Sequence, residues 1–162
     1  MEQNLTTEKK KTVSIKKTFN LPLKTVWKAF TEPETFKKWC GPENYTCPAA
    51  SIDFKVGGKY LFSMKGEDGK EIWSTGTYKE IIPFKKIVYT DNFSDSNGNI
   101  IPASDYNMPG EWNSDLLVTI LFEEVDGKTN LSLEHVGIPA EVYNDTHSGW
   151  QSMLDKIEKN IK

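Results

Sequence analysis

Histidine and cysteine, the side chains best suited to catalysis at neutral pH, occur only four times in this sequence. His135 is the one candidate for a catalytic or ligand-orienting group, because an imidazole can accept a proton or donate a hydrogen bond to a ligand carbonyl. The alternative is a partly buried histidine satisfied by a backbone carbonyl. His147 is expected to pack or to cap a helix. Cys40 and Cys47 are distant in sequence from both histidines, so their positions do not indicate a thiol nucleophile.

The spacing of the residues indicates no metal site and no cofactor site. The sequence has no Cys-x-x-Cys pair and no Cys/His cluster, so we expect no metal and no cofactor. Two free thiols are expected in a reducing compartment, with a Cys40–Cys47 disulfide as the alternative. A carboxylate that points into a core is costly unless it is paired, so acids within strands are expected to point outward or to meet a lysine. These acids are Asp53, Glu80, Asp91 and Glu134.

The charged residues narrow the range of partners. All 20 basic residues are lysine, which excludes the bidentate contacts that arginine makes with phosphate, carboxylate or guanine. The lysines are dispersed and the net charge is −3, which argues against a nucleic-acid partner. No apolar run reaches the roughly 20 residues of a membrane span and no signal peptide is recognisable, so a cytoplasmic location is expected. The pattern indicates no particular oligomeric state.

The elements that must position these side chains are mostly strands. Residues 1–11 are expected to form a flexible tail, and residues 12–162 have the size of one domain. Alternating apolar residues predict a strand over 12–19, and three- and four-residue spacing predicts short helices over 23–30 and 33–39. Period-two patterns and turn residues then predict a meander of antiparallel strands. These strands cover about residues 60–64, 71–82, 87–93, 118–122 and 129–135.

The C-terminal segment carries the longest amphipathic pattern. Large side chains from Tyr143 to Ile161 recur at three- and four-residue intervals, which predicts a helix with one apolar face. Strands followed by a long helix indicate an α+β fold, in which a strongly curved antiparallel sheet of about six to seven strands wraps around the C-terminal helix. A curved sheet and a straight helix do not match in shape, so a cavity between them is expected. A fully packed core is the alternative.

Several segments together resemble one known family. They are Leu21–Trp39 (LPLKTVWKAFTEPETFKKW), Val56–Tyr60 (VGGKY), the turn Asp68–Gly69, Gly76–Pro83 (GTYKEIIP), Asp126–Leu133 (DGKTNLSL) and His147–Ile157 (HSGWQSMLDKI). In them the chain is similar to bacterial proteins grouped with the C-terminal domain of the activator of heat shock protein 90 ATPase. These proteins belong to the START-like, birch-pollen-allergen-like (SRPBCC) helix-grip superfamily. The resemblance implies a cavity of the kind used for lipids, hormones and polyketides, and a chaperone of the heat shock protein 90 class as a further partner.

The expected function is binding of an apolar or amphipathic small molecule, lipid-like or polyketide-like, without a catalytic signature. The alternatives are stimulation of a heat shock protein 90 homologue, and a cyclase or dehydratase that uses the same cavity through His135. The expected cavity lining is Tyr60, Phe62, Met64, Ile120, Phe122, Leu131, Leu133, His135, Trp150, Met153 and Leu154. Residues 94–114 show neither the helical nor the strand pattern of apolar residues, and they are expected to form a lid over the cavity. The lid residues expected to face the ligand are Tyr106, Met108 and Trp112.

Overall fold

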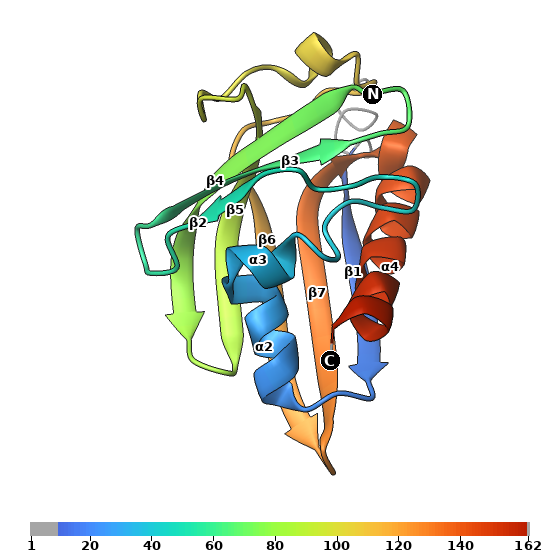
Figure 1. Cartoon of the computed structure of the whole chain (residues 1–162). Coiled ribbons are helices and arrows are strands. Elements are labelled where there is room, and N and C mark those ends of the chain that lie inside the picture. The colour runs from blue at the N-terminus through green and yellow to red at the C-terminus, as the bar shows by residue number, and fades with distance from the viewer. Residues whose placement is uncertain (1–9, 162) are drawn as a thin grey trace, which may run out of the picture.

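A computed structural model describes residues 10–161 of the chain. Seven strands, three α-helices and two short 3-10 helices follow one another along this part (Figure 1). In order they are β1 (Lys10–Phe19), α2 (Leu23–Thr31), α3 (Pro33–Phe36), β2 (Ala50–Ile52), β3 (Lys59–Lys65), β4 (Glu71–Ile82), β5 (Lys86–Ser94), η1 (Ala103–Tyr106), β6 (Leu116–Val125), β7 (Lys128–Pro139), η2 (Ala140–Val142) and α4 (Tyr143–Asn160). Of the tail expected over 1–11, residues 1–9 lie outside the described part, and Lys10 and Lys11 already belong to β1.

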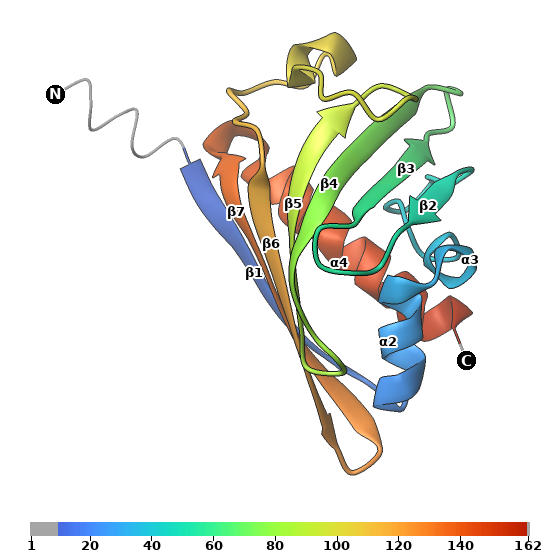
Figure 2. The ribbon, with the colours of Figure 1, turned by 90° about the vertical axis from the view of Figure 1, so that its left-hand side faces the viewer.

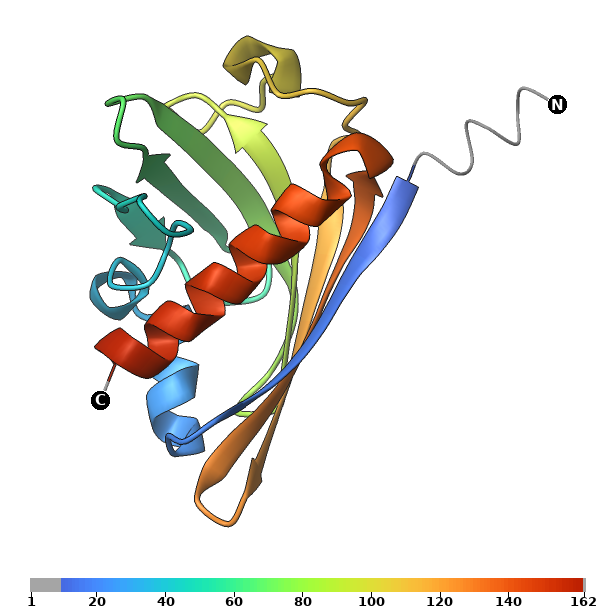
Figure 3. The ribbon, with the colours of Figure 1, turned by 90° about the vertical axis from the view of Figure 1, so that its right-hand side faces the viewer.

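All seven strands form one antiparallel sheet in the order β1-β7-β6-β5-β4-β3-β2. Strands that follow each other in the chain are neighbours in the sheet, except that β1 pairs with β7 instead of β2. The sheet is strongly bent, α4 crosses its concave side, and α2 and α3 lie near the C-terminal end of α4 (Figures 2 and 3). The architecture confirms the α+β plan predicted from the pattern of elements and the helix-grip fold implied by the resemblance.

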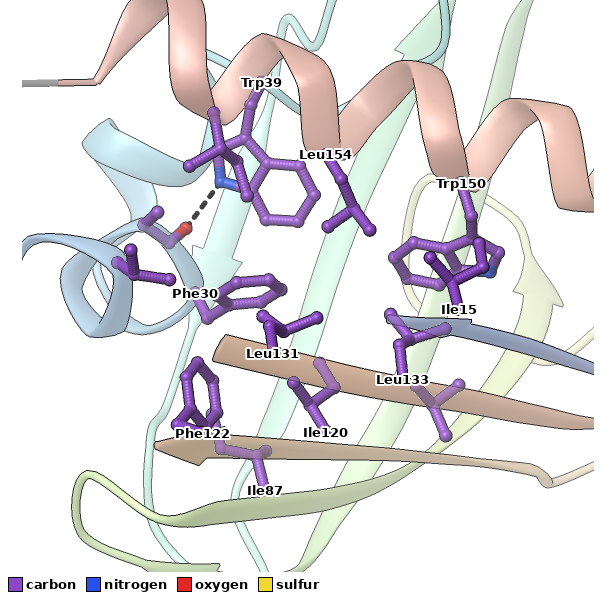
Figure 4. Close-up of a cluster of buried hydrophobic side chains, with 14 of the residues drawn as sticks. Ile15, Phe30, Trp39, Ile87, Ile120, Phe122, Leu131, Leu133, Trp150 and Leu154 are labelled. Carbon is purple, nitrogen blue, oxygen red and sulfur yellow. Dashed lines mark hydrogen bonds between the residues drawn. The ribbon is translucent and has the colours of Figure 1, made fainter. Parts of the chain in front are cut away.

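Packing of α4 on the sheet follows from its apolar stripe. Trp150, Leu154 and Ile157 are the buried residues of this helix, spaced four and three residues apart. Figure 4 shows Trp150 facing Ile15 and Leu133, which pair across β1 and β7. The first and last strands therefore form one apolar platform for the helix. Full burial of each such side chain contributes ~1.5–3 kcal/mol relative to exposure.

An aromatic cluster fixes the path of the chain after α2. The Trp39 indole N–H donates a 2.7 Å hydrogen bond to the Ala29 carbonyl oxygen, and the Phe30 and Trp39 rings lie 4.8 Å apart (Figure 4). The helix expected over 33–39 is shorter than predicted, because α3 ends at Phe36 and turns carry the chain onward. Gly41 then has a φ of +92°, which an L side chain rarely adopts, and the chain leaves the helical direction there.

Two further elements have no strong signal in the sequence. β2 is only three residues long, too short for a period-two pattern, and pairs with β3 through Ala50–Phe62 and Ile52–Tyr60. The segment 94–114, expected to be without regular structure, contains the single turn η1. The Tyr106 hydroxyl at its end donates to the Ser94 carbonyl oxygen and accepts the Trp73 backbone N–H, so this segment is tied to the sheet.

Candidate functional site

A cavity of about 430 Å³ lies between α4 and the sheet. Its volume falls within the roughly 300–1,000 Å³ of small-molecule sites. Its walls come from the α2–β2 region, strands β3 to β7, the segment before β6, and α4. Eleven of its 28 lining residues are aromatic. The aromatic lining residues are Phe30, Phe36, Trp39, Tyr45, Tyr60, Phe62, Tyr78, Tyr89, Phe93, Trp112 and Trp150.

The α4 side of the cavity is set by helical spacing. Asp145, Thr146, Gly149, Trp150 and Met153 line it from consecutive turns of one helix face. Gly149 leaves part of this face without a side chain, because a Cβ atom built there meets only Pro42 Cβ within 4 Å, at 3.9 Å. A larger side chain at position 149 therefore projects into the cavity.

Strand alternation sets the sheet side. On β5, residues Ile87, Tyr89, Asp91 and Phe93 all line the cavity, because every second side chain of a strand points to the same face. This places a carboxylate, Asp91, among apolar neighbours. The sequence had suggested an outward orientation or a lysine partner for this residue, and the structure gives it neither.

Two polar side chains, Tyr60 and His135, lie beside the Asp91 carboxylate, and Trp150 lies behind His135. The Tyr60 hydroxyl lies 2.8 Å from the Thr90 carbonyl oxygen and 3.0 Å from Asp91 Oδ1. His135 Nε2 lies 3.4 Å from Asp91 Oδ2, and the Trp150 indole N–H donates a 3.1 Å hydrogen bond to His135 Nδ1. Burial, together with the nearby Asp91 charge, holds the pKa of Tyr60 well above its usual value, so the phenol stays protonated.

The tautomer of His135 follows from its partner. An indole N–H is a donor only, so Nδ1 accepts and carries no proton, and we assign the proton of the neutral ring to Nε2. Nε2 lies 3.4 Å from Asp91 Oδ2 and makes no hydrogen bond within the described structure. Because Nδ1 is occupied by the indole and the side chain is 5% exposed, His135 is poorly placed as a general base for a ligand. Asp91 is the polar group that the cavity exposes instead, with 28% of its side chain accessible.

The structure separates the residues expected to line the cavity into two groups. Those that line it are Tyr60, Phe62, Met64, Ile120, His135, Trp150 and Met153. Those that belong to the packed core outside its lining are Phe122, Leu131, Leu133 and Leu154. On α4 the lining ends at Met153, and the next inward-facing residues, Leu154 and Ile157, are fully buried.

Of the three expected lid residues, two line the cavity and one does not. Met108 and Trp112 line the cavity, and Tyr106 does not, because its hydroxyl is bound to the sheet. His147 lies outside the lining as well and packs on Tyr143, with ring centroids 5.9 Å apart.

A thiol pair lies beside the cavity. Cys40 and Cys47 are both free and buried, and Cys40 contributes to the lining. Burial raises the pKa of Cys40, whereas the hydrogen bond from the Cys40 thiol lowers the pKa of Cys47, with help from Lys37 and Lys156. Over residues 10–161, no three His, Cys, Asp or Glu side chains come together in a way that could hold a metal ion.

The fold and the cavity define a class: a helix-grip protein with a space between the sheet and the closing helix that is lined by aromatic residues and partly open to solvent. Residues 20–162 match the family described as Activator of Hsp90 ATPase homolog 1-like protein. The chain belongs to this family, which confirms the resemblance drawn from its segments. No helix in the described part of the chain is long and apolar enough to cross a membrane.

Solved structures of similar proteins share the fold over nearly the whole chain. A Chromobacterium violaceum protein is 27% identical with a TM-score of 0.73, covering 91% of this chain and 94% of that one. A Staphylococcus epidermidis protein is 27% identical with a TM-score of 0.68, covering 93% and 89%. The AHSA1 protein of Silicibacter pomeroyi, 18% identical with a TM-score of 0.72 over 92% and 96%, is similar in fold. No curated protein sequence matches the chain.

Proposed function

We propose that this protein binds an apolar or amphipathic small molecule, lipid-like or polyketide-like, in the cavity between α4 and the sheet. The observation that carries the proposal is the aromatic-lined space of about 430 Å³. A concave, largely apolar space of this size that is partly open to solvent has the form of a small-molecule site. Binding free energy comes mainly from apolar burial, at ~25 cal/mol per Å².

The experiment tests occupancy of this cavity directly. N-phenyl-1-naphthylamine, a neutral fluorescent probe, is titrated into the wild type and into Gly149→Leu, whose new side chain enters the space beside Pro42. Losing two or three buried methylene contacts at ~0.8 kcal/mol each corresponds to at least about a tenfold loss of affinity. Ser148→Leu is the matched control, because Ser148 is exposed and precedes Gly149 on the same helix. Equal affinity in all three proteins, or none in the wild type, would refute the proposal.

The family match motivates one alternative role, stimulation of a heat shock protein 90 homologue. Such a role depends on an outer surface and is therefore independent of the cavity. It is tested by adding the purified protein to the bacterial chaperone and measuring ATP hydrolysis. Stimulation that persists in Gly149→Leu supports a surface function, and an unchanged hydrolysis rate with the wild type contradicts it.

An enzymatic use of the same cavity, as a cyclase or dehydratase, has a different candidate residue from the one that the sequence suggests. Asp91 is accessible from the cavity, whereas Nδ1 of His135 is occupied by the indole and the side chain is 5% exposed. Turnover of a candidate substrate that is lost in Asp91→Asn and retained in His135→Gln would support this alternative.

A further inference from the structure

We infer that the ligand carries a protonated amine, and that Asp91 is its counter-ion in the cavity. The inference rests on the proposed function, since it concerns the chemical class of the molecule that the cavity holds. Four observations on the described residues carry it: the charges of the lining, the state of His135, the shortage of donors around Asp91, and the aromatic walls.

The charges of the lining are all negative. Within residues 10–161, the only charged groups that line the cavity are the carboxylates of Asp91 and Asp145. None of the 18 lysines within that range does so, and the chain contains no arginine. A fatty acid or another anionic amphiphile therefore meets like charge and no counter-ion. An ammonium group meets the opposite charge in surroundings of low polarity, where the attraction is stronger than in water.

The neighbouring histidine does not neutralise Asp91. Its Nδ1 accepts the hydrogen bond of the Trp150 indole at 3.1 Å, and an imidazolium could not accept it. His135 is 5% exposed and its Nε2 has no hydrogen-bond partner within the described structure, at 3.4 Å from Asp91 Oδ2. The negative charge of Asp91 therefore remains available to a ligand.

The cluster is also short of hydrogen-bond donors. The single hydroxyl proton of Tyr60 lies between two acceptors, the Thr90 carbonyl oxygen at 2.8 Å and Asp91 Oδ1 at 3.0 Å. A carboxylate has about four lone-pair positions, so most of the accepting capacity of Asp91 is unused. A primary ammonium brings three donors and a positive charge together, and a hydroxyl brings one donor and no charge.

The walls beside Asp91 suit a cation as well as an apolar body. Tyr89 and Phe93 flank it on the same face of β5, and Tyr60 packs edge-on to Tyr89 with ring centroids 5.3 Å apart. Aromatic faces attract cations, by an amount that increases when water is excluded. The structure thus combines a counter-ion with aromatic walls, the combination that favours an arylalkyl or alkyl amine.

The test compares three molecules that differ only in their polar end: 4-phenylbutylamine, 4-phenylbutanol and 4-phenylbutanoate. Binding to the wild type, Asp91→Asn and Glu123→Gln is measured at pH 7 by calorimetry. We expect the amine to bind the wild type at least about tenfold more tightly than the alcohol, with the carboxylate weakest. Asp91→Asn keeps the size of the side chain and should abolish this preference. Glu123→Gln also removes one carboxylate, but at an exposed position outside the lining, and should retain the preference.

The outcomes separate this inference from the proposed function. If the alcohol binds as tightly as the amine, or Asp91→Asn keeps the preference, the cavity binds ligands but does not select a cation, and the inference is wrong. If none of the three molecules binds and the neutral probe does not bind either, both proposals are wrong. The ranking on the wild type is decisive by itself if Asp91→Asn does not fold, as judged by circular dichroism.

Discussion

Cys47 is the more acidic of the two thiols beside the cavity. The main cause is the hydrogen bond from the Cys40 thiol, which stabilises the Cys47 thiolate, and the positive charges of Lys37 and Lys156 act in the same direction. Cys40 has the opposite behaviour, because burial disfavours its charged form and raises its pKa. Two cysteines with six residues between them therefore differ in reactivity for reasons that lie in their surroundings.

Replacing Cys40 by alanine should raise the pKa of Cys47, because the thiolate then loses its hydrogen-bond donor. Thiolate formation is followed by absorbance near 240 nm as the pH increases, with Cys47→Ala as the reference for the remaining absorbance. In the wild type the Cys47 signal should develop below the pH of an ordinary thiol, whose pKa is about 8.5. A midpoint that stays in place in Cys40→Ala would show that the Cys40 thiol is not the cause.

At the residue scale, the sequence identified His135 and missed Asp91. The parity of Leu131, Leu133 and His135 on β7 directs the histidine inward, which the structure shows as 5% exposure. The same parity rule applied to Ile87 and Tyr89 on β5 would have found Asp91, but the cost of an inward carboxylate argued against it. A sequence does not reveal that Tyr60, from another strand, approaches that carboxylate.

At the scale of elements, α4 holds the loop that leads into β2. Lys156 Nζ donates hydrogen bonds to the carbonyl oxygens of Gly41, Pro42 and Tyr45 at 2.7, 3.0 and 3.0 Å. The Ser152 hydroxyl oxygen accepts the Glu43 backbone N–H at 2.7 Å. Because Pro42 and Tyr45 line the cavity, these bonds also hold part of its wall.

Lys156→Met should lower the free energy of unfolding by about 1–2 kcal/mol, because three carbonyl oxygens lose a charged donor at a partly exposed position. Urea denaturation measures the change. Lys159→Met is the control, since Lys159 is exposed on the last turn of the same helix and should change stability by less than about 0.5 kcal/mol. Equal losses in the two variants would contradict an anchoring role for Lys156.

The sequence predicted the long elements better than the cavity between them. The apolar stripe of α4 and the alternating apolar residues of β6 and β7 are clear signals in the sequence, because each of these elements has one buried face. β2 was not predicted, because three residues are too few to show an alternating apolar pattern. α3 is shorter than predicted, because Trp39 bonds to the Ala29 carbonyl oxygen of α2 instead of continuing the helix. The position of the cavity depends on where the sheet bends away from α4. That bend is a tertiary feature, so Leu154 and Leu131, expected in the lining, are core residues.

For the whole molecule, the buried Tyr60 and Tyr78 and the partly buried Tyr89 link stability to alkaline pH. Burial raises the pKa of Tyr60, Tyr78 and Tyr89, and for Tyr60 and Tyr89 the Asp91 charge adds to this effect. In the unfolded chain a tyrosine loses its proton near pH 10, while in the folded protein these phenols keep theirs. Stability is therefore complete below about pH 10 and decreases as the pH rises further, because ionisation favours the unfolded state.

The free energy of unfolding should thus fall steeply above about pH 10 in the wild type and less steeply in Tyr78→Phe, which removes one ionisable group while keeping the ring. Urea denaturation at several pH values measures the slope. Absorbance at 295 nm, which reports phenolate, should rise in two steps, the second coinciding with unfolding. A single step near pH 10 without unfolding would mean that the three rings are accessible to hydroxide.

The pairing of β1 with β7 has a consequence for the order in which the protein forms. Phe19 pairs with Thr129 and Lys10 with Pro139, so partners more than a hundred positions apart must meet. Loop closure over such distances is slow, and on the ribosome β1 has to wait until most of the polypeptide has been synthesised. The platform under α4 is completed only then, and α4 is the last helix to emerge. The cavity is therefore complete only after β7 and α4 have been synthesised, and a chain stalled before β7 contains every aromatic lining residue except Trp150 but lacks the strand and the helix that close the space.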